Sequence, residues 1–478
     1  MNVRDTLPAT LAKQAISDNE MRKVVTASVM GTIIEYYDFT LYTTATALVF
    51  NKIFFRNEMR KVVTASVMGT IIEYYDFTLY TTATALVFNK IFFRGETPLI
   101  GSLTAFATYF VGYCARPLGG VLFGHFGDRV GRKITLMMTL MIMGIGTLLI
   151  GLIPPYAQIG VWAPVALVLL RCLQGIGIGG EYGGGMTMVV EHSPPGRRGF
   201  YSALMHIGVP AGFLLPIIAI TLLNAFLDER AFLSWGWRIP FLFSVVLLGI
   251  GLFIRSQISE TPAFKKIQRE GSQASVPVLE ALRHHFPTIL LGIGAKIAES
   301  GLFNIYAVFA ISYCVNVLSL SSQVILYGIL LACLLECFTL PLFGHLADRY
   351  GKKRVYLAGM IAQALLAWPF MLMLASGHLG LIYLAIALGL GLGHGSTFGA
   401  QGAVFSALFP ARIRYSGLSL VQQIGPILGG GLSPMIATAL LVGWHNNGLI
   451  AGYMALMAVI SGLCALRLRE EKIPPSQV

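Results

Sequence analysis

Long apolar stretches separated by short polar segments follow one another along the chain. Beyond residue 98 they are about as long as a helix that crosses a bilayer, which takes about 20 residues. We therefore expect an all-α membrane protein, because a helix satisfies its backbone hydrogen bonds internally in lipid. The expected spans are residues 99–123, 134–153, 161–190, 199–223, 239–254, 288–315, 324–343, 355–375, 381–408, 415–442 and 449–466.

The segment that precedes these spans occurs twice. Residues 19–56 and 57–94 are identical at every position. Such identity indicates a recent tandem duplication or an artefact, and the apolar stretch of one copy is surplus. We expect twelve spans that begin with the second copy. The first copy then lies displaced at the surface or forms a thirteenth, peripheral span.

Composition and loop charge fix the expected orientation. Only 12% of the residues are charged, against about 25% in soluble domains. The net charge of +12 is confined to short loops, without a basic helix or an aromatic and basic sheet face, so we expect no nucleic-acid partner. Basic loops alternate with loops that carry no net positive charge, and the positive-inside rule then places both termini in the cytoplasm.

A polar linker divides the expected spans into two halves. The expected parts are a cytoplasmic tail at 1–18, the surplus copy at 19–56, an amino-terminal six-helix bundle at 57–256, a cytoplasmic linker at 257–287, a carboxyl-terminal six-helix bundle at 288–467 and a cytoplasmic tail at 468–478. The first tail is polar and has no apolar core, so we do not expect a cleaved signal peptide.

A charged segment recurs in each half. GHFGDRVGRK, at 124–133, returns as GHLADRYGKK at 344–353. We expect both to be short charged loops between spans, and their recurrence indicates two related membrane halves. The matching positions that we expect at a gate are Gly124, Asp128, Arg129 and Arg132, and Gly344, Asp348, Arg349 and Lys352.

Two carboxylates occur inside the first apolar stretch. Glu73 and Asp76 are three residues apart and share one helix face, with Tyr75 between them. A carboxylate in a low-dielectric site can take up and release a proton near neutral pH. We therefore expect Glu73 and Asp76 to couple transport to protons, with a structural pair near the start of the helix as the alternative.

The fourth stretch combines an arginine with many glycines. Arg171, Gln174 and Glu181 fall on one side of a helix in LLRCLQGIGIGGEYGGG. An arginine within the membrane needs a carboxylate partner or an anionic ligand. We expect Arg171 and Gln174 to bind substrate and Glu181, which we count with them in the binding site, to keep Arg171 or the helix in register. The alternative is a glycine-rich packing seam with a structural ion pair.

Polar residues in the other spans admit two interpretations each. Arg116 fits gate packing or substrate contact, Lys296 and Glu299 fit an internal pair or a binding site, and Glu336 fits support of the second charged segment. His394 and Gln422 fit a satisfied core or the cavity. We include Glu299, His394, Gln422 and Tyr75 among the expected substrate-binding residues.

Five segments together carry a resemblance to a known family. They are GHFGDRVGRK, GHLADRYGKK, GTIIEYYDF, RCLQGIGIGGEYGG and SWGWRIPFLFS at 234–244. With these the chain resembles the major facilitator superfamily, and within it the metabolite:proton symporters. RYSG at 414–417, together with Glu299, His394 and Gln401, is similar to bacterial shikimate transporters. The resemblance implies a twelve-helix major facilitator fold of two six-helix bundles with one surplus duplicated first helix, working by alternating access.

The expected function is proton-coupled symport of a small organic metabolite in the bacterial inner membrane. An arginine in the cavity favours a carboxylate such as shikimate or a di- or tricarboxylate. A proline or betaine symporter and a non-transporting, receptor-like membrane protein remain alternatives. The six scattered cysteines have no metal spacing. We find no nucleophile–base arrangement or phosphate loop, so we expect no enzyme activity, cofactor or metal, and a monomer in the bilayer.

Overall fold

A computed structural model describes residues 58–88, 91–92, 98–194, 196–271, 274–444 and 446–469, with the side chains of 98–110 left out. The predicted tail 1–18, the first copy 19–56 and residues 470–478 lie outside the described residues. All regular secondary structure in the described part is helical. Residues Asn57–Val478 form one compact unit.

The amino-terminal bundle contains six helical spans, some of them built from consecutive segments. They are α2 (Glu58–Ala83) with the π-helix η1 (Thr84–Phe88), α4 (Pro98–Arg129), α5 (Arg132–Leu152), α7 (Trp162–His192), α8 (Arg198–His206) with α9 (Gly208–Phe226), and α10 (Glu229–Ala231) with η2 (Phe232–Gly236) and α11 (Arg238–Ser256). A short helix, α6 (Tyr156–Ile159), joins α5 to α7.

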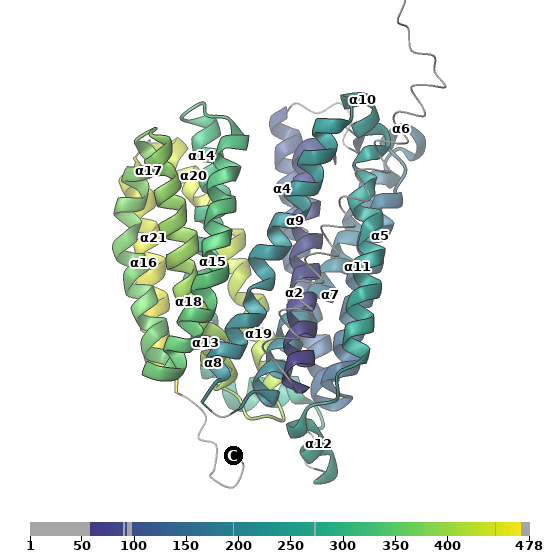
Figure 1. Cartoon of the computed structure of the whole chain (residues 1–478), viewed down its shortest axis with the longest axis vertical. Coiled ribbons are helices and arrows are strands. Elements are labelled where there is room, and N and C mark those ends of the chain that lie inside the picture. Colours follow the sequence, from purple (N-terminus) through teal and green to yellow (C-terminus); the bar gives the residue numbers. More distant parts are fainter. Residues whose placement is uncertain are drawn as a thin grey trace, which may run out of the picture. The chain divides into compact units, whose positions relative to one another are not determined.

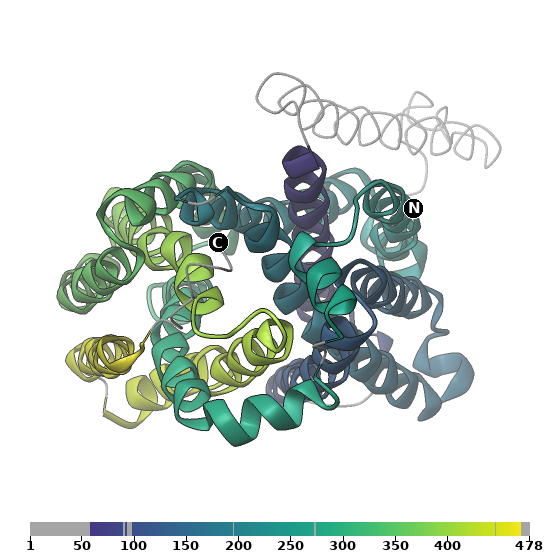
Figure 2. The same cartoon turned by 90° about the horizontal axis from the view of Figure 1, so that it is seen from below.

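The carboxyl-terminal bundle contains six more spans and follows the linker helix α12 (Pro262–Arg269). They are α13 (Pro277–Asn304) with η3 (Ile305–Phe309) and α14 (Ala310–Asn316), α15 (Ser322–Tyr350), α16 (Lys352–Ala375), α17 (Leu379–Ile386) with η4 (Ala387–His394) and α18 (Gly395–Ser406), α19 (Arg414–Pro426) with η5 (Ile427–Gly431) and α20 (Ser433–Trp444), and α21 (Asn447–Arg467). The two bundles lie side by side (Figures 1 and 2).

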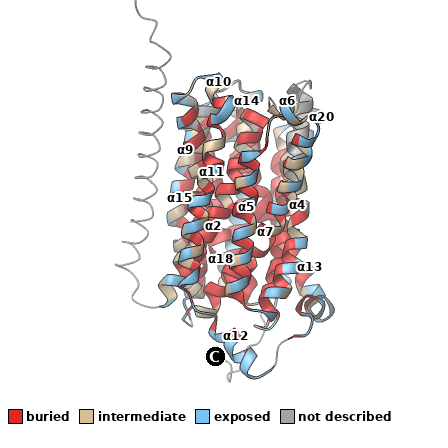
Figure 3. Ribbon diagram, turned by 90° about the vertical axis from the view of Figure 1, so that its right-hand side faces the viewer, coloured by how far each residue is buried: buried red, intermediate tan, exposed pale blue. Residues whose placement is uncertain are grey.

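The outer faces of the bundles are apolar. Among the described residues, ten helical stretches are long and apolar enough to cross a membrane. Large apolar side chains such as Phe338, Leu365 and Trp162 are more than 70% exposed, which suits contact with lipid rather than water. Buried residues fill the interior of the bundles (Figure 3).

Glycines allow the helices of the amino-terminal bundle to pack closely. A Cβ atom on Gly119 of α4 would lie 1.9 Å from the Ile176 carbonyl oxygen of α7, and one on Gly179 of α7 would lie 2.1 Å from the Arg116 carbonyl oxygen. Only a residue without a side chain fits at these contacts. These contacts agree with the glycine-rich packing seam that was the alternative interpretation of the fourth span.

The two charged segments are largely helical rather than loops, which corrects our expectation. Helix α4 continues through Arg129 and α5 begins at Arg132, so that only two residues lie between them. Gly131 and Gly351 make the turns with φ angles of +133° and +99°, which residues with a Cβ rarely adopt. The charged side chains therefore have fixed positions at the ends of rigid helices.

The linker is shorter than its polar sequence indicates. Helix α13 begins at Pro277, before the expected span at 288–315, and His285 interrupts it with φ −123° and ψ 17°. The helical turns before this kink belong to the predicted linker 257–287. Phe264 and Ile267 of α12 are buried, whereas Lys265 and Lys266 are exposed, so α12 is the amphipathic helix expected in this linker.

Candidate functional site

A cavity lies between the two bundles, with walls from both. The space between atoms there, including the part open to solvent, is about 650 Å³. Its lining consists of Glu73, Tyr74, Phe77, Tyr113, Arg116, Tyr182 and Val209 from the amino-terminal bundle, and Lys296, Glu299, Ser300, Phe303, Asn304, His394, Phe398, Gln422, Gln423 and Pro426 from the carboxyl-terminal bundle.

The amino-terminal wall presents Glu73 and Arg116. Glu73 is buried, and its Oε2 atom has no hydrogen-bond partner among the described residues. The Arg116 guanidinium lies 4.4 Å from the ring centroid of Tyr113 and 5.0 Å from that of Phe77. Within the described part of the chain no carboxylate forms an ion pair with Arg116. This half-buried cation is therefore available to an anionic ligand.

The carboxyl-terminal wall presents a lysine that is already paired. Lys296 and Glu299 of α13 form an ion pair, as one of the two sequence interpretations held. The Lys296 ammonium also donates to Gln401 Oε1 over 3.3 Å and lies 5.3 Å from the Phe398 ring centroid. The pair is buried yet borders the cavity, so a ligand can compete for the ammonium.

His394 stands between two carboxylates. Its Nε2 atom is 3.1 Å from Glu299 Oε1, and its Nδ1 atom is 2.5 Å from Glu336 Oε1. Glu336 is fully buried in α15. The sequence favoured Glu336 as support for the second charged segment, and the structure corrects this by placing its carboxylate against His394.

A chain of hydrogen bonds that begins at Lys296 connects the two bundles. Gln401 Nε2 of α18 donates to the Tyr182 hydroxyl of α7 over 3.3 Å, and that hydroxyl is 2.9 Å from His206 Nε2 of α8. The His206 ring stacks on Phe398 with centroids 3.8 Å apart. Lys296 is thus connected through Gln401 to the amino-terminal bundle.

The first helix of each bundle repeats one pattern around the cavity. A glutamate is followed four residues later by phenylalanine and three residues after that by tyrosine, as Glu73, Phe77 and Tyr80 in α2 and as Glu299, Phe303 and Tyr306 in α13 and η3. Both glutamates and both phenylalanines line the cavity, and both tyrosines are buried. The two bundles therefore offer matching acidic positions to one ligand.

The predicted site residues divide into two groups. Glu73, Glu299, His394 and Gln422 line the cavity. Asp76, Tyr75, Arg171, Gln174 and Glu181 are buried but do not line it. The Tyr75 hydroxyl, for example, donates to the Pro240 carbonyl within the amino-terminal bundle. The structure thus separates residues that we expected to act together in proton coupling and substrate binding.

Phe77 separates the cavity from Arg171. The Phe77 ring centroid is 5.0 Å from the Arg116 guanidinium and 5.2 Å from that of Arg171. Behind this ring, Arg171 Nη1 donates to Gln174 Oε1 over 3.2 Å, and Gln174 Nε2 donates to Thr147 over 2.6 Å. Arg171 also lies 4.1 Å from the Tyr80 ring centroid. These groups form an interior polar network of the amino-terminal bundle.

Glu181 is held by Arg255 and not by Arg171, contrary to our expectation. Arg255 and Glu181 form a buried ion pair, and the Thr139 hydroxyl donates to Glu181 Oε2 over 2.9 Å. Arg255 directly follows the expected span at 239–254. The structure shows it at the last turn of α11, with its side chain turned into the bundle.

At one end of the bundles, each charged segment binds the start of a helix in the other bundle. Asp128 at the end of α4 accepts hydrogen bonds from the backbone N–H groups of Tyr415 and Ser416, over 3.4 and 2.9 Å. Asp348 at the end of α15 accepts from those of Gly199 and Phe200, over 2.7 and 2.8 Å. We call this end the motif end. A carboxylate at a helix amino terminus is stabilised by the helix dipole.

A buried charge cluster surrounds Asp128. Arg132 Nη2 lies 3.4 Å from Asp128, 3.7 Å from Glu191 and 2.8 Å from the Ala411 carbonyl oxygen. Glu191 also pairs with Arg414 over 3.0 Å. The cluster contains residues of both bundles, so it fastens them together at the motif end.

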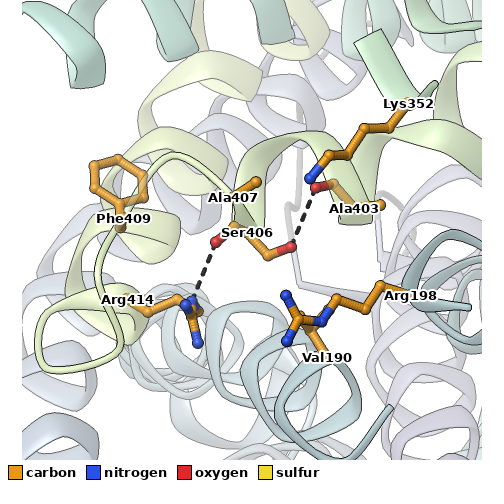
Figure 4. Close-up of a pocket in the computed structure, with 8 residues that line it drawn as sticks. All are labelled: Val190, Arg198, Lys352, Ala403, Ser406, Ala407, Phe409 and Arg414. Carbon is orange, nitrogen blue, oxygen red and sulfur yellow. Dashed lines mark hydrogen bonds between the residues drawn. The ribbon is translucent and has the colours of Figure 1, made fainter. Parts of the chain in front are cut away.

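Three cations, one of them Arg414, lie beside the end of α18. Figure 4 shows Arg198, Arg414 and Lys352 around Ser406, whose carbonyl oxygen accepts from Arg414 Nε over 3.1 Å. Lys352 belongs to the second charged segment and is half-buried. Its position next to residues of both bundles agrees with the predicted place of the segment.

The glycines of the charged segments permit the bundles to touch. A Cβ atom on Gly344 would lie 2.6 Å from the Gly199 carbonyl oxygen, and one on Gly124 would lie 2.9 Å from Ser416 Cα. Arg129 and Arg349 are exposed and point away from these contacts. The bundles are therefore closed against each other at the motif end.

Four residues of the site could have been recognised from the sequence, although we did not count them among the expected site residues. Arg116, Lys296, Glu336 and Gln401 are polar residues inside apolar spans, and such residues face the interior of a bundle or a cavity. Glu191 and Arg414 lie next to basic loops, where a charge is ordinary. Only the contact between the bundles identifies these two residues.

The comparisons with known proteins agree with this architecture. The family model of the Major Facilitator Superfamily matches residues 66–425 and, in a second match, 301–477. The chain belongs to the major facilitator superfamily. It is a multi-pass membrane transporter, and not an enzyme, with the twelve-helix fold of that superfamily.

Members of this superfamily with curated names are similar over nearly the full length. The chain is 39% identical to the shikimate transporter of Escherichia coli (strain K12), covering 96% of each chain. It is 38% identical to the inner membrane metabolite transport protein YhjE of the same strain, covering 95% of each. It is 35% identical to the proline/betaine transporter of Salmonella typhimurium (strain LT2), covering 97% of this chain and 86% of the relative.

A solved structure of the superfamily has the same fold. The proton:xylose symporter XylE, bound to 6-bromo-6-deoxy-D-glucose, matches with a TM-score of 0.73 and 16% sequence identity. The match covers 87% of this chain and 96% of XylE. At this identity the likeness extends to the fold and not to the substrate.

Proposed function

We propose that this protein is a symporter of the bacterial inner membrane that carries a small organic carboxylate together with protons. The observation that carries the proposal is Arg116, a cation that borders the cavity between the bundles and has no carboxylate partner among the described residues. An unpaired guanidinium in a desolvated site attracts an anionic ligand and can bind a carboxylate in a bidentate manner.

The remainder of the cavity suits a compact molecule with polar substituents. Tyr74, Tyr113 and Phe398 offer aromatic faces, whereas Asn304 and Gln422 offer amide groups for hydroxyl or carboxylate oxygens. The names of the relatives include a shikimate transporter, and shikimate is a cyclic hydroxy acid. We therefore place substrates of this chemistry first, followed by di- and tricarboxylates.

Glu73 and Asp76 remain our proton-coupling residues, with different positions. Glu73 borders the cavity, whereas Asp76 is buried outside the cavity lining, near Arg171 and Thr147. We propose that Arg171 and Gln174 bind substrate only in a conformation in which Phe77 has moved. In the present conformation they organise the network around Asp76.

The closed motif end supports alternating access. Asp128 and Asp348 hold the bundles together there, and the positive charge of the neighbouring loops favours the cytoplasmic side for this end by the positive-inside rule. We propose that these contacts break when the cavity opens inward. Each chain contains a whole cavity, so a monomer suffices.

A zwitterionic osmolyte is the second candidate, favoured by a specific feature of the cavity. Tyr74, Phe77 and Tyr113 lie near Glu73, and aromatic rings with a carboxylate bind quaternary ammonium groups. The proline/betaine transporters among the relatives agree with this option. In this case Arg116 binds the carboxylate of the osmolyte and Glu73 its cation.

Uptake by reconstituted vesicles tests the proposal. Purified protein in liposomes with an acidic outside should accumulate labelled shikimate or a di- or tricarboxylate, and the Arg116→Gln variant should lose most of this uptake. Accumulation of proline or betaine alone favours the osmolyte symporter. If no organic acid or osmolyte enters, either with or without residues 19–56, a non-transporting, receptor-like protein explains the chain better.

A further inference from the structure

We propose that Glu299, His394 and Glu336 together form a second proton-binding site, and that a substrate carboxylate at Lys296 controls its occupancy. This inference rests on the proposed proton-coupled transport of a carboxylate. It adds a site in the carboxyl-terminal bundle to Glu73 and Asp76 in the amino-terminal bundle.

Hydrogen-bond chemistry fixes the number of protons in this cluster. Each ring nitrogen of His394 lies within hydrogen-bond distance of a carboxylate oxygen, Nε2 of Glu299 and Nδ1 of Glu336. An ionised carboxylate only accepts hydrogen bonds, and a neutral imidazole donates just one. Both bonds therefore form only if His394 is doubly protonated or one carboxyl group is protonated. The observed arrangement holds one proton more than the fully deprotonated set.

Charge balance ties this proton to Lys296. The proton and the Lys296 ammonium together neutralise the carboxylates of Glu299 and Glu336, all within a buried site. Without the proton, one negative charge remains unbalanced in surroundings of low dielectric, which is unfavourable by several kcal/mol. From the facing helices, the ring centroid of Tyr182 of α7 lies 6.0 Å from the Lys296 ammonium, and His206 of α8 is hydrogen-bonded to the Tyr182 hydroxyl.

The matching place in the other bundle contains a permanent cation. Arg116 precedes Asp128 by twelve residues in α4, and Glu336 precedes Asp348 by twelve in α15. In the amino-terminal bundle, Arg116 thus places a fixed positive charge on the same cavity as Glu73. In the carboxyl-terminal bundle, the corresponding residue is the carboxylate Glu336, which His394 connects to Glu299. The positive charge there has to come from a proton, which can leave.

The substrate and this proton then favour each other's binding. A carboxylate that enters the cavity between Arg116 and Lys296 draws the ammonium away from Glu299, and it adds a negative charge next to the cluster. Both changes stabilise the protonated cluster. Because such coupling is reciprocal, the proton also raises the affinity for the carboxylate. The pair enters as a neutral unit, and release of either partner promotes release of the other.

Proton uptake during binding is the direct test. Purified wild-type protein in weakly buffered solution with a pH indicator, at a pH high enough that the substrate-free cluster has lost its proton, should take up protons when shikimate or another transported carboxylate is added. The Glu336→Gln variant should take up fewer protons, whereas Glu270→Gln, a change in the exposed linker, should match the wild type. Binding without any proton uptake by the wild type overturns the inference.

Transport assays separate this inference from the proposed function. In liposomes, Glu336→Gln should retain substrate exchange without a gradient. With a difference of one pH unit across the membrane, its ratio of internal to external substrate should fall about tenfold, because one coupled proton contributes a factor of about ten. Gradient-driven uptake that is equal in wild type and Glu336→Gln overturns the second site and leaves the proposed function intact. Absence of such uptake in the wild type overturns the proposed function itself.

A second variant covers the case in which Glu336→Gln does not fold. Glu299→Gln also removes one of the two carboxylates, so that the Lys296 ammonium balances the remaining one and the cluster needs no further proton. It should show the same loss of proton uptake on binding. Proton uptake equal to that of the wild type in this variant contradicts the inference.

Discussion

Asp128 and Asp348 bind each other's bundle in the same way. Each carboxylate lies at the end of the second helix of its bundle and accepts two backbone N–H groups at the start of the fifth helix of the other bundle. The approximate repeat of the sequence thus becomes a reciprocal contact. Because both contacts lie at the motif end, they stabilise the same closed state.

Removing these charges should weaken closure at the motif end. Hydrogen bonds to an ionised acceptor contribute about 1.5–3 kcal/mol, against about 0.5–1.5 for neutral pairs. Asp128→Asn or Asp348→Asn should therefore raise the open population about tenfold. A cysteine introduced at Ala403 beside the gate, in a background without the six native cysteines, should react faster with a soluble maleimide.

The exposed Arg354 provides the control for this experiment. Arg354→Gln should leave the labelling rate at Ala403 unchanged. Equal labelling of the asparagine variants and this control would show that the two aspartates do not determine closure.

Arg116 and Arg171 of the amino-terminal bundle should respond differently to substitution. Arg116→Gln removes the cation that borders the cavity, and its dissociation constant for a transported carboxylate should rise by about tenfold to a hundredfold. Arg171→Gln should change this constant much less, because Phe77 lies between Arg171 and the cavity. Thermal-shift titration of both variants measures the difference.

This comparison also shows whether Arg116 or Arg171 binds the substrate carboxylate. A larger loss of affinity in Arg171→Gln than in Arg116→Gln would restore Arg171 as the substrate ligand. It would also require that Phe77 moves when substrate binds.

Glu181 should be essential to stability because of its partner. Glu181→Gln leaves the buried Arg255 guanidinium without its counter-ion, which lowers the free energy of unfolding by about 3–5 kcal/mol. The double variant Glu181→Gln with Arg255→Met should recover part of this loss, since it removes the uncompensated charge. Thermal unfolding in detergent measures both. A double variant no more stable than Glu181→Gln would argue against an ion-pair effect.

Deletion of residues 19–56 should preserve folding and transport. Residues 57–94 supply the same sequence, and Asn57–Val478 form a compact unit by themselves. We expect unchanged binding and uptake of the shortened chain in liposomes. Loss of insertion or of uptake would show that the first copy has a function of its own.

The fold could be predicted from the sequence to a large extent, because spans in lipid have a strong apolar signal. The recurrence of Asp128 and Asp348 indicated two related halves, and the structure has two bundles. The path of the chain within a bundle was harder to predict. Arg255 follows an apolar span and precedes a polar linker, and no sequence pattern shows that its side chain turns inward to Glu181.

The candidate site could be predicted only in part, for a physical reason. Periodicity tells which residues share a helix face, but not which face meets the other bundle. Glu73 and Asp76 are three residues apart, yet Glu73 lines the cavity and Asp76 does not. Glu336 and His394 lie far apart in the sequence, so their contact depends on the packing of α15 against η4.

The π-helical segments have a consequence for how the membrane spans can move. A π-helical turn contains more residues than an α-helical one and retains main-chain hydrogen bonding. Such segments interrupt the first, seventh, tenth and eleventh spans as η1, η3, η4 and η5. A span that contains such an additional residue can bend or shift its register while its peptide groups stay hydrogen-bonded and are not exposed to the lipid hydrocarbon. The walls of the cavity can therefore rearrange while their surroundings in the bilayer stay dry.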